Sequence, residues 1–127
     1  MSLKRIHLEL ARHRDFPNGS RHHGYDLTAP LDDDGHLAAG EWKTRRAACR
    51  VRRFWAGAPE EHGLLVHRPG GAWVIDYNPS SRTDDEPGFK FDKHRFVPGE
   101  YVTITEHDGE QRAFRVVSVL DEAEAAG

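Results

Sequence analysis

The sequence predicts a mainly β fold, a small antiparallel β-barrel of about eight short strands with one short α-helix. Short alternating apolar runs recur along the chain, and Asn-Gly, Gly-Gly and Asp-Gly turns separate them at the spacing typical of barrels and sandwiches. The 127 residues, 37% of them hydrophobic, are enough for one packed core. We therefore expect a single barrel domain over residues 1–120 and a flexible tail over residues 121–127.

The first hairpin is expected from residues 4–12 and 22–29, with the turn at Asn18-Gly19. A two-residue turn there places Leu10 opposite Leu27 and Leu8 opposite Ala29. These pairs gather apolar side chains on one face, and the other face is polar, as in a sheet with one side in water.

The second hairpin is expected from residues 64–68 and 72–77, joined at Gly70-Gly71. This turn pairs Val66 with Ile75, which contributes to the core. It also pairs Arg68 with Trp73, a cation–π contact.

The third hairpin has two registers to choose between. A two-residue Asp108-Gly109 turn splits the apolar residues between the two faces of the sheet. A three-residue loop over 107–109, with Gly109 left-handed, pairs Val102 with Phe114 and keeps the apolar residues together, so we expect this register. A further strand is expected around Phe89 and Phe91, after a polar loop over residues 78–87.

The middle of the chain predicts the helix, over about residues 37–47 with Asp34 as a candidate cap. A strand over 49–55 is expected next, and a continuous helix is the alternative. If a bulge interrupts this strand, Phe54 joins the core and Trp55 the polar face; without the bulge their places are exchanged. The expected core residues are Leu8, Leu10, Leu27, Val51, Val66, Ile75, Val102, Ile104, Phe114 and Val116.

The composition indicates the cellular compartment and shows which covalent links could stabilise the fold. No apolar run approaches the roughly 20 residues of a membrane span, and the N-terminal residues lack the apolar run of a secretory signal, so we expect a cytoplasmic protein without membrane contact. The lone Cys49 cannot form an internal disulfide, and we expect it to be buried as a small hydrophobic side chain.

The segment PLDDDGHLAAGE resembles the calcium loop of EF-hands. Asp32, Asp34, Gly35 and Glu41 match that pattern, but Pro30 occupies the place of its first carboxylate ligand. An acidic turn that precedes a helix explains these aspartates without calcium.

The nine histidines offer few candidate ligands or bases. His22 and His23 are adjacent on an expected strand and point to opposite faces, so a surface site that includes His13 is the remaining metal-binding alternative. The chain contains no Gly-x-Ser-x-Gly motif. We therefore predict no catalytic residue, no cofactor and no metal site, and a binding protein rather than an enzyme.

The segment RFVPGEYVTI, residues 95–104, resembles the F-x-P-G-Q-Y-V barrel strand of the ferredoxin-reductase-like flavin domains. The Arg-x-Tyr-Ser/Thr flavin motif of those domains is missing from this chain. The resemblance thus implies a barrel strand after a Pro-Gly turn, and no flavin.

The segment KTRRAACRVRRFW, residues 43–55, has six basic residues and no acidic one in a chain whose net charge is −3. Its expected binding face consists of Arg50, Arg52, Arg53, Phe54 and Trp55. The overall acidity favours arginines that meet acidic groups of this chain, of a second copy or of a protein partner. We therefore predict a noncatalytic binding or protein-interaction module. Two alternatives stay open: a single-stranded nucleic-acid-binding barrel that uses this strand, and a small histidine-dependent hydrolase or metal-binding protein.

Overall fold

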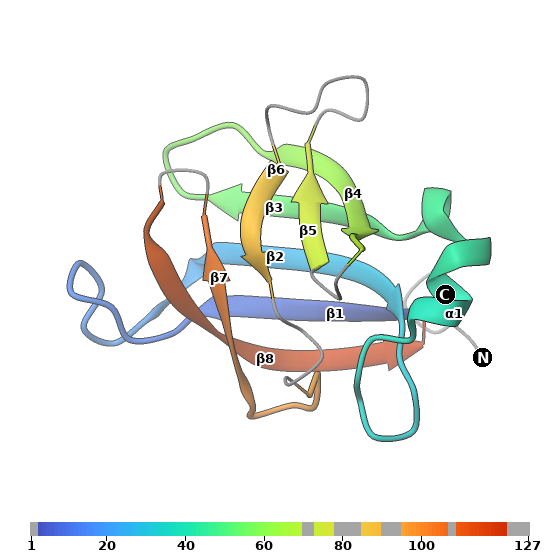
Figure 1. Ribbon diagram of the computed structural model, residues 1–127. Helices are drawn as coiled ribbons and strands as arrows, with labels where there is room; N and C mark the ends of the chain where they lie inside the picture. Colours follow the sequence, from blue (N-terminus) through green and yellow to red (C-terminus); the bar gives the residue numbers. More distant parts are fainter. Residues whose placement is uncertain (1–2, 70–72, 78–84, 90–94, 107–108, 122–127) are drawn as a thin grey trace.

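The computed structural model describes residues 3–69, 73–77, 85–89, 95–106 and 109–121. Its strands form one antiparallel sheet that curls into a half-barrel, and one short helix lies at the end of the sheet (Figure 1). This arrangement confirms the predicted mainly β, barrel-like fold. The strands are β1 (Leu3–Leu10), β2 (Ser20–Pro30), β3 (Arg50–Trp55), β4 (Glu61–His67), β5 (Trp73–Asp76), β6 (Asp85–Phe89), β7 (Tyr101–Thr105) and β8 (Gln111–Asp121).

The order of strands in the sheet is β6-β5-β4-β3-β2-β1-β8-β7. The two edge strands, β6 and β7, come to lie side by side as the sheet curls (Figure 1). β6 begins at Asp85, so its first residues were wrongly assigned to the polar loop over 78–87, while Phe91 lies outside the described residues. β8 ends at Asp121, whose carboxylate forms an ion pair with Lys4, so the strand enters the region expected to be tail.

The register predicted for the first hairpin is wrong by four residues. Leu8 pairs with Tyr25 and Ile6 with Leu27, because residues 11–19 form a long connection instead of a two-residue turn at Asn18-Gly19. Within this connection His13 and Phe16 form an isolated bridge. An even shift leaves each side chain on the same face of the sheet, so the apolar face is still the buried one.

The register predicted for the second hairpin is wrong by one residue. Leu65, and not Val66, pairs with Ile75, and Leu65 is the buried side chain of the two. Trp73 correspondingly pairs with His67 instead of Arg68, and the two ring centroids are 4.5 Å apart. The sequence Leu-Leu-Val offers an apolar residue to either face, so its pattern does not discriminate between the two registers.

The third hairpin confirms the three-residue loop. Val102 pairs with Phe114, and Gly109 has a φ of +84°, in the left-handed region. The loop is closed by the Glu106 N–H, which donates to the Glu110 carbonyl at 3.0 Å. The other two loop residues lie outside the described part of the chain. β7 follows a turn at Pro98-Gly99, as the resemblance to barrel strands implies.

The middle of the chain contains a shorter helix than expected. α1 spans Ala39–Thr44, and a 3-10 turn, η1, spans Arg46–Ala48. Asp34 is not its cap, because the cap residue is Ala38, whose side chain accepts no hydrogen bond. β3 confirms the strand over 49–55, and its pairing with β2 is continuous, so no bulge is present. Among the described residues, no helix is long and apolar enough to cross a membrane.

The core lies inside the curled sheet. Nine of the ten expected core residues are buried, and Val66 is only partly so. Cys49 is fully buried and donates its S–H to the Arg45 carbonyl at 3.4 Å. The helix closes one end of the barrel with Trp42, whose indole N–H donates to the Leu65 carbonyl at 2.8 Å and whose ring meets Trp73 edge to face.

Candidate functional site

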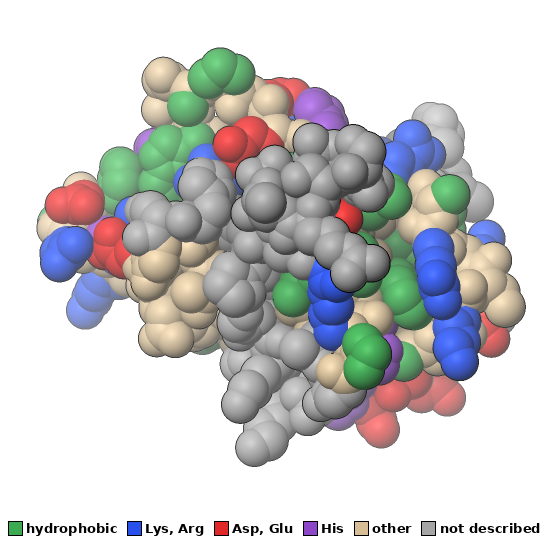
Figure 2. Space-filling model, turned by 45° about the horizontal axis from the view of Figure 1, so that its top comes forward, with side chains coloured by type: hydrophobic (Ala, Val, Ile, Leu, Met, Phe, Trp, Pro, Cys, Tyr) green, Lys and Arg blue, Asp and Glu red, His purple; other side chains and the backbone are tan. Residues whose placement is uncertain are grey.

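The predicted binding face is divided between the two sides of the sheet. Because β3 has no bulge, its side chains alternate regularly: Arg50, Arg52 and Phe54 point outward, whereas Arg53 and Trp55 point inward. The remaining basic residues of the segment are exposed: Lys43 on α1, Arg46 on η1, and Arg45 between these two elements. Figure 2 shows basic side chains gathered on the right, the side on which α1 lies in Figure 1.

On the outer side, Arg52 meets acidic side chains of its own chain, as expected. Its guanidinium forms an ion pair with Asp26 and another with Glu60, at 2.5 Å. The hydrogen bond to Asp26 raises the pKa of Arg52 above its ordinary value. The guanidinium also lies 5.0 Å from the centroid of the Phe54 ring, which stacks on His7. This arginine is therefore already bound within the molecule.

On the inner side, Arg53 belongs to a buried network around Glu106, a side chain that is only 1% exposed. The carboxylate accepts hydrogen bonds from Tyr25 Oη at 2.5 Å, Arg53 Nε at 2.8 Å and Arg112 Nη1 at 2.7 Å. Burial disfavours the charge on Arg53, but the hydrogen bond and charge of Glu106 outweigh it and raise the pKa of the guanidinium. The guanidinium also lies 4.3 Å from the Trp55 ring centroid. One carboxylate thus holds two arginines inside the barrel.

The network continues to the rim of the barrel through Glu110. Its carboxylate accepts from Arg112 Nη2 and from His13 Nε2, both at 2.9 Å. His13 Nδ1 accepts the N–H of Asp15 at 3.2 Å, which assigns the proton of this ring to Nε2. His13 therefore lies beside Glu110 and Asp15.

His23 is the best placed candidate for a catalytic base. Its Nδ1 lies 2.7 Å from the Ser20 hydroxyl, and burial lowers its pKa. Its ring packs against Phe16 and Trp55, with ring-centroid distances of 4.5 Å and 4.3 Å. The Ser20 oxygen also accepts the His22 N–H, so the hydroxyl forms a local turn at the start of β2. No carboxylate of the described residues hydrogen-bonds to His23, so the pair resembles a structural contact more than a nucleophile and its oriented base.

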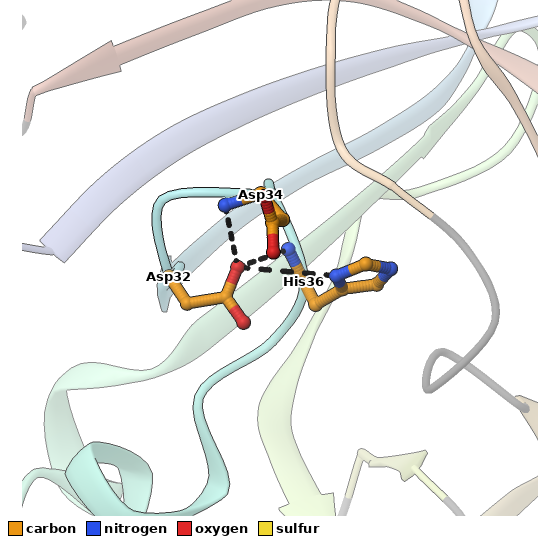
Figure 3. A group of neighbouring side chains, drawn as sticks. All are labelled: Asp32, Asp34 and His36. Atoms are coloured by element: carbon orange, nitrogen blue, oxygen red, sulfur yellow. Dashed lines mark hydrogen bonds and ion pairs between the residues drawn. The ribbon is translucent and has the colours of Figure 1, made fainter.

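The EF-hand-like segment forms a tight acidic turn (Figure 3). One carboxylate oxygen of Asp32 accepts the backbone N–H groups of Asp34 at 2.9 Å and His36 at 3.0 Å. These hydrogen bonds, that of His36 first, lower the pKa of Asp32. Ligand atoms of the three side chains lie within 4.8 Å of one another, and Glu41, which matches the last EF-hand ligand, is not part of the group. One oxygen of the Asp32 carboxylate is therefore used within the turn itself.

A groove on the outer surface was not anticipated from the sequence. It has a volume of about 770 Å³ and lies between the β1–β2 connection, which projects to the left in Figure 1, and the strands β7 and β8. Tyr101, at 59% exposure, lies in it opposite Arg115 on the neighbouring strand. Arg12 and Arg21 line the same groove from the two ends of the connection. All three arginines are exposed, and within the described residues none of them has an ion-pair partner.

The groove lies at one end of a row of outward-facing residues that crosses five strands. Tyr101 is followed by Arg115, Glu9, Gly24 and Phe54. Glu9 is held by His7, whose Nε2 lies 3.0 Å from its carboxylate. Gly24 is required here, because a Cβ would lie 2.8 Å from the Phe54 ring and 2.0 Å from the Leu8 carbonyl oxygen. The register predicted for the third hairpin already places Tyr101 opposite Arg115. This pairing of an exposed aromatic residue with an arginine was the feature of the sequence from which the groove could have been predicted.

The chain matches no protein-family model, and neither curated proteins nor solved structures show a significant similarity to it.

Proposed function

We propose that this protein is a noncatalytic binding module that holds an anionic partner in the groove around Tyr101. One observation carries the proposal. Arg12, Arg21 and Arg115 gather around an exposed aromatic ring and have no acidic partner among the described residues. The proposal therefore moves the binding surface from β3 to the groove.

The contrast with Arg52 and Arg53 of β3 supports this choice. Arg52 is bound by Asp26 and Glu60, and Arg53 is bound by Glu106, so neither is available to a partner without loss of an existing contact. The groove arginines would lose only water. A partner that supplies negative charge gains their attraction at a small cost in desolvation.

The exposed ring is the second support. Exposed tyrosine and arginine are enriched where proteins bind partners, because the ring buries a large area while losing little conformational entropy. Tyr101 and Leu120 are the large hydrophobic side chains that the described surface exposes, and only Tyr101 lies in the groove. A solvated arginine by itself is ordinary, whereas three around such a ring form a surface with a defined preference for anions.

A polyanion tests the proposal before the natural partner is known. Fluorescein-labelled heparin is titrated with the protein at 50 and 200 mM NaCl, and anisotropy is measured. The wild type should bind at the lower salt concentration and several-fold more weakly at the higher one. The variant R12E/R21E/R115E should bind at least tenfold more weakly.

The matched control is R5E/K43E/R50E, which changes the net charge equally at exposed positions outside the groove. It should bind clearly better than the groove variant. No binding by the wild type at 50 mM NaCl, or equal losses in the two variants, would contradict the proposal.

A further inference from the structure

We infer that the anionic partner of the groove is single-stranded nucleic acid, with Tyr101 stacked on a base and the three arginines on phosphates. This inference rests on the proposed function and gives it a ligand class. It also replaces the arginine-rich strand, on which the sequence-based nucleic-acid hypothesis depended, with a different surface.

The position of the tyrosine ring favours a base as its ligand. Tyr101 is 59% exposed on the first residue of β7, and its ring contacts no other aromatic ring of the described residues. Every base presents a π-face, but in a duplex these faces are covered by neighbouring bases. A ring that stands free on a sheet surface therefore suits an unpaired strand.

The arginines are distributed as a sugar–phosphate backbone requires. Arg115 lies directly across the strand pair from Tyr101, whereas Arg12 and Arg21 approach the groove from the connection between β1 and β2. A single strand can thus place one base on the ring and successive phosphates along the groove. An acidic peptide would satisfy the same charges, but its carboxylates have no use for the exposed ring.

The acidic residue of the groove does not oppose this arrangement. Glu9 lies between Arg115 and Gly24 in the sheet, but its carboxylate is bound to His7. Three arginines therefore face one partly compensated glutamate. The net charge of −3 for the whole chain makes us expect binding that is moderate in strength and sensitive to salt.

The experiment compares four labelled probes by anisotropy: a twelve-nucleotide oligothymidylate, a DNA duplex of equal length, poly-glutamate and heparin. The oligothymidylate should bind more tightly than the duplex or the peptide. Three phosphate contacts predict a log–log slope of about −2 against salt, and each Arg→Gln substitution in the groove should reduce the slope by about 0.7.

Substitution of the ring separates stacking from charge. Tyr101→Ala should weaken binding of the oligothymidylate by about 5- to 150-fold. The same variant should leave heparin binding nearly unchanged, and Tyr101→Phe should retain oligothymidylate binding because the aromatic ring remains. Since Tyr101 is exposed, unchanged melting temperatures will show that these variants fold.

The possible results separate the two proposals. If heparin binds through the groove arginines but the oligothymidylate is not preferred, or if Tyr101→Ala does not affect it, the nucleic-acid inference is wrong and the proposed function stands. Tighter binding of poly-glutamate would likewise overturn the inference in favour of an acidic protein partner. If no probe binds, both proposals fail.

Discussion

Glu106 is expected to be the most sensitive polar position of the barrel. It is 1% exposed and is the shared acceptor for Arg53 and Arg112, whose side chains are each only 11% exposed. Glu106→Gln nearly preserves the shape of the side chain but removes its charge. Two buried guanidinium groups then lose the charge of their shared carboxylate, while Arg112 keeps its ion pair with Glu110.

The size of the effect follows from the burial of the network. Removal of one partner from a buried ion pair costs about 3–5 kcal/mol, because the other charge remains buried. The entropy of unfolding of a chain of this length is about 0.27 kcal/mol per kelvin. The melting temperature should therefore fall by roughly 10–20 °C, as measured by circular dichroism or calorimetry.

A matched control distinguishes burial from loss of charge. Glu60→Gln removes one carboxylate that is 49% exposed and paired with Arg52, so it should cost only about 0–1 kcal/mol, a decrease of at most about 4 °C. A triple variant, E106L/R53M/R112L, removes the charges together and should recover much of the loss from Glu106→Gln. If Glu106→Gln melts within 4 °C of the wild type, the network is not a source of stability and this reasoning is refuted.

Three further predictions concern other parts of the molecule. Burial lowers the pKa of His23 below 6.5, so the unfolded state binds a proton more readily than the folded state, and stability should fall as the pH decreases below about 6.5. Chemical denaturation at pH 7.5 and 5.5 should show a smaller loss of unfolding free energy in His23→Phe than in the wild type. Gly24→Ala should lower the free energy of unfolding by at least about 1–3 kcal/mol, because its Cβ would lie 2.0 Å from the Leu8 carbonyl oxygen. Gly40→Ala should raise the free energy of unfolding by up to about 1 kcal/mol, because Gly40 lies in α1 with open space around it. Denaturation curves that rank the two variants the other way would contradict this prediction. Calcium, zinc or EDTA should each change the melting temperature by less than about 2 °C, because Asp32, Asp34 and His36 form a small, exposed group that lacks Glu41, and a shift of several degrees would show a metal site.

The local pattern of the sequence was sufficient for the fold class and for one of the three hairpins. The third hairpin offered two registers, and only one kept Val102 and Phe114 on the same face, so the apolar pattern determined the answer. The register predicted for the first hairpin was wrong because a shift of four residues keeps every side chain on the same face of the sheet. The apolar pattern does not distinguish registers that differ by such a shift. The long connection that caused it is held by contacts to residues distant in sequence, from His13 to Glu110 and from the Ala11 N–H to the Ala113 carbonyl, which local turn preferences do not include.

The polar interior was missed for a different reason. The correct register of the third hairpin pairs Ile104, a core residue, with Arg112, and Glu106 follows on the same face. Alternation therefore already placed both charges inside the barrel. We nevertheless did not expect charged side chains inside the barrel, because an isolated buried charge is very costly. The partners that make their burial tolerable, Tyr25 and Arg53, come from strands that are not adjacent to β7 or β8 in the sheet.

The charge pairing also explains why the most basic segment is not the surface that we propose for binding. A strand in a curled sheet presents alternate residues to the interior, so the consecutive Arg52 and Arg53 must lie on opposite faces. Each forms an ion pair with a carboxylate on its own side of the sheet, Arg52 with Asp26 outside and Arg53 with Glu106 inside. Arg12, Arg21 and Arg115 are dispersed in sequence, and among the described residues they have no ion-pair partner where the fold brings them together. What distinguishes Arg12, Arg21 and Arg115 is that they meet around the exposed ring of Tyr101, and a count of charges along the chain does not identify such a group.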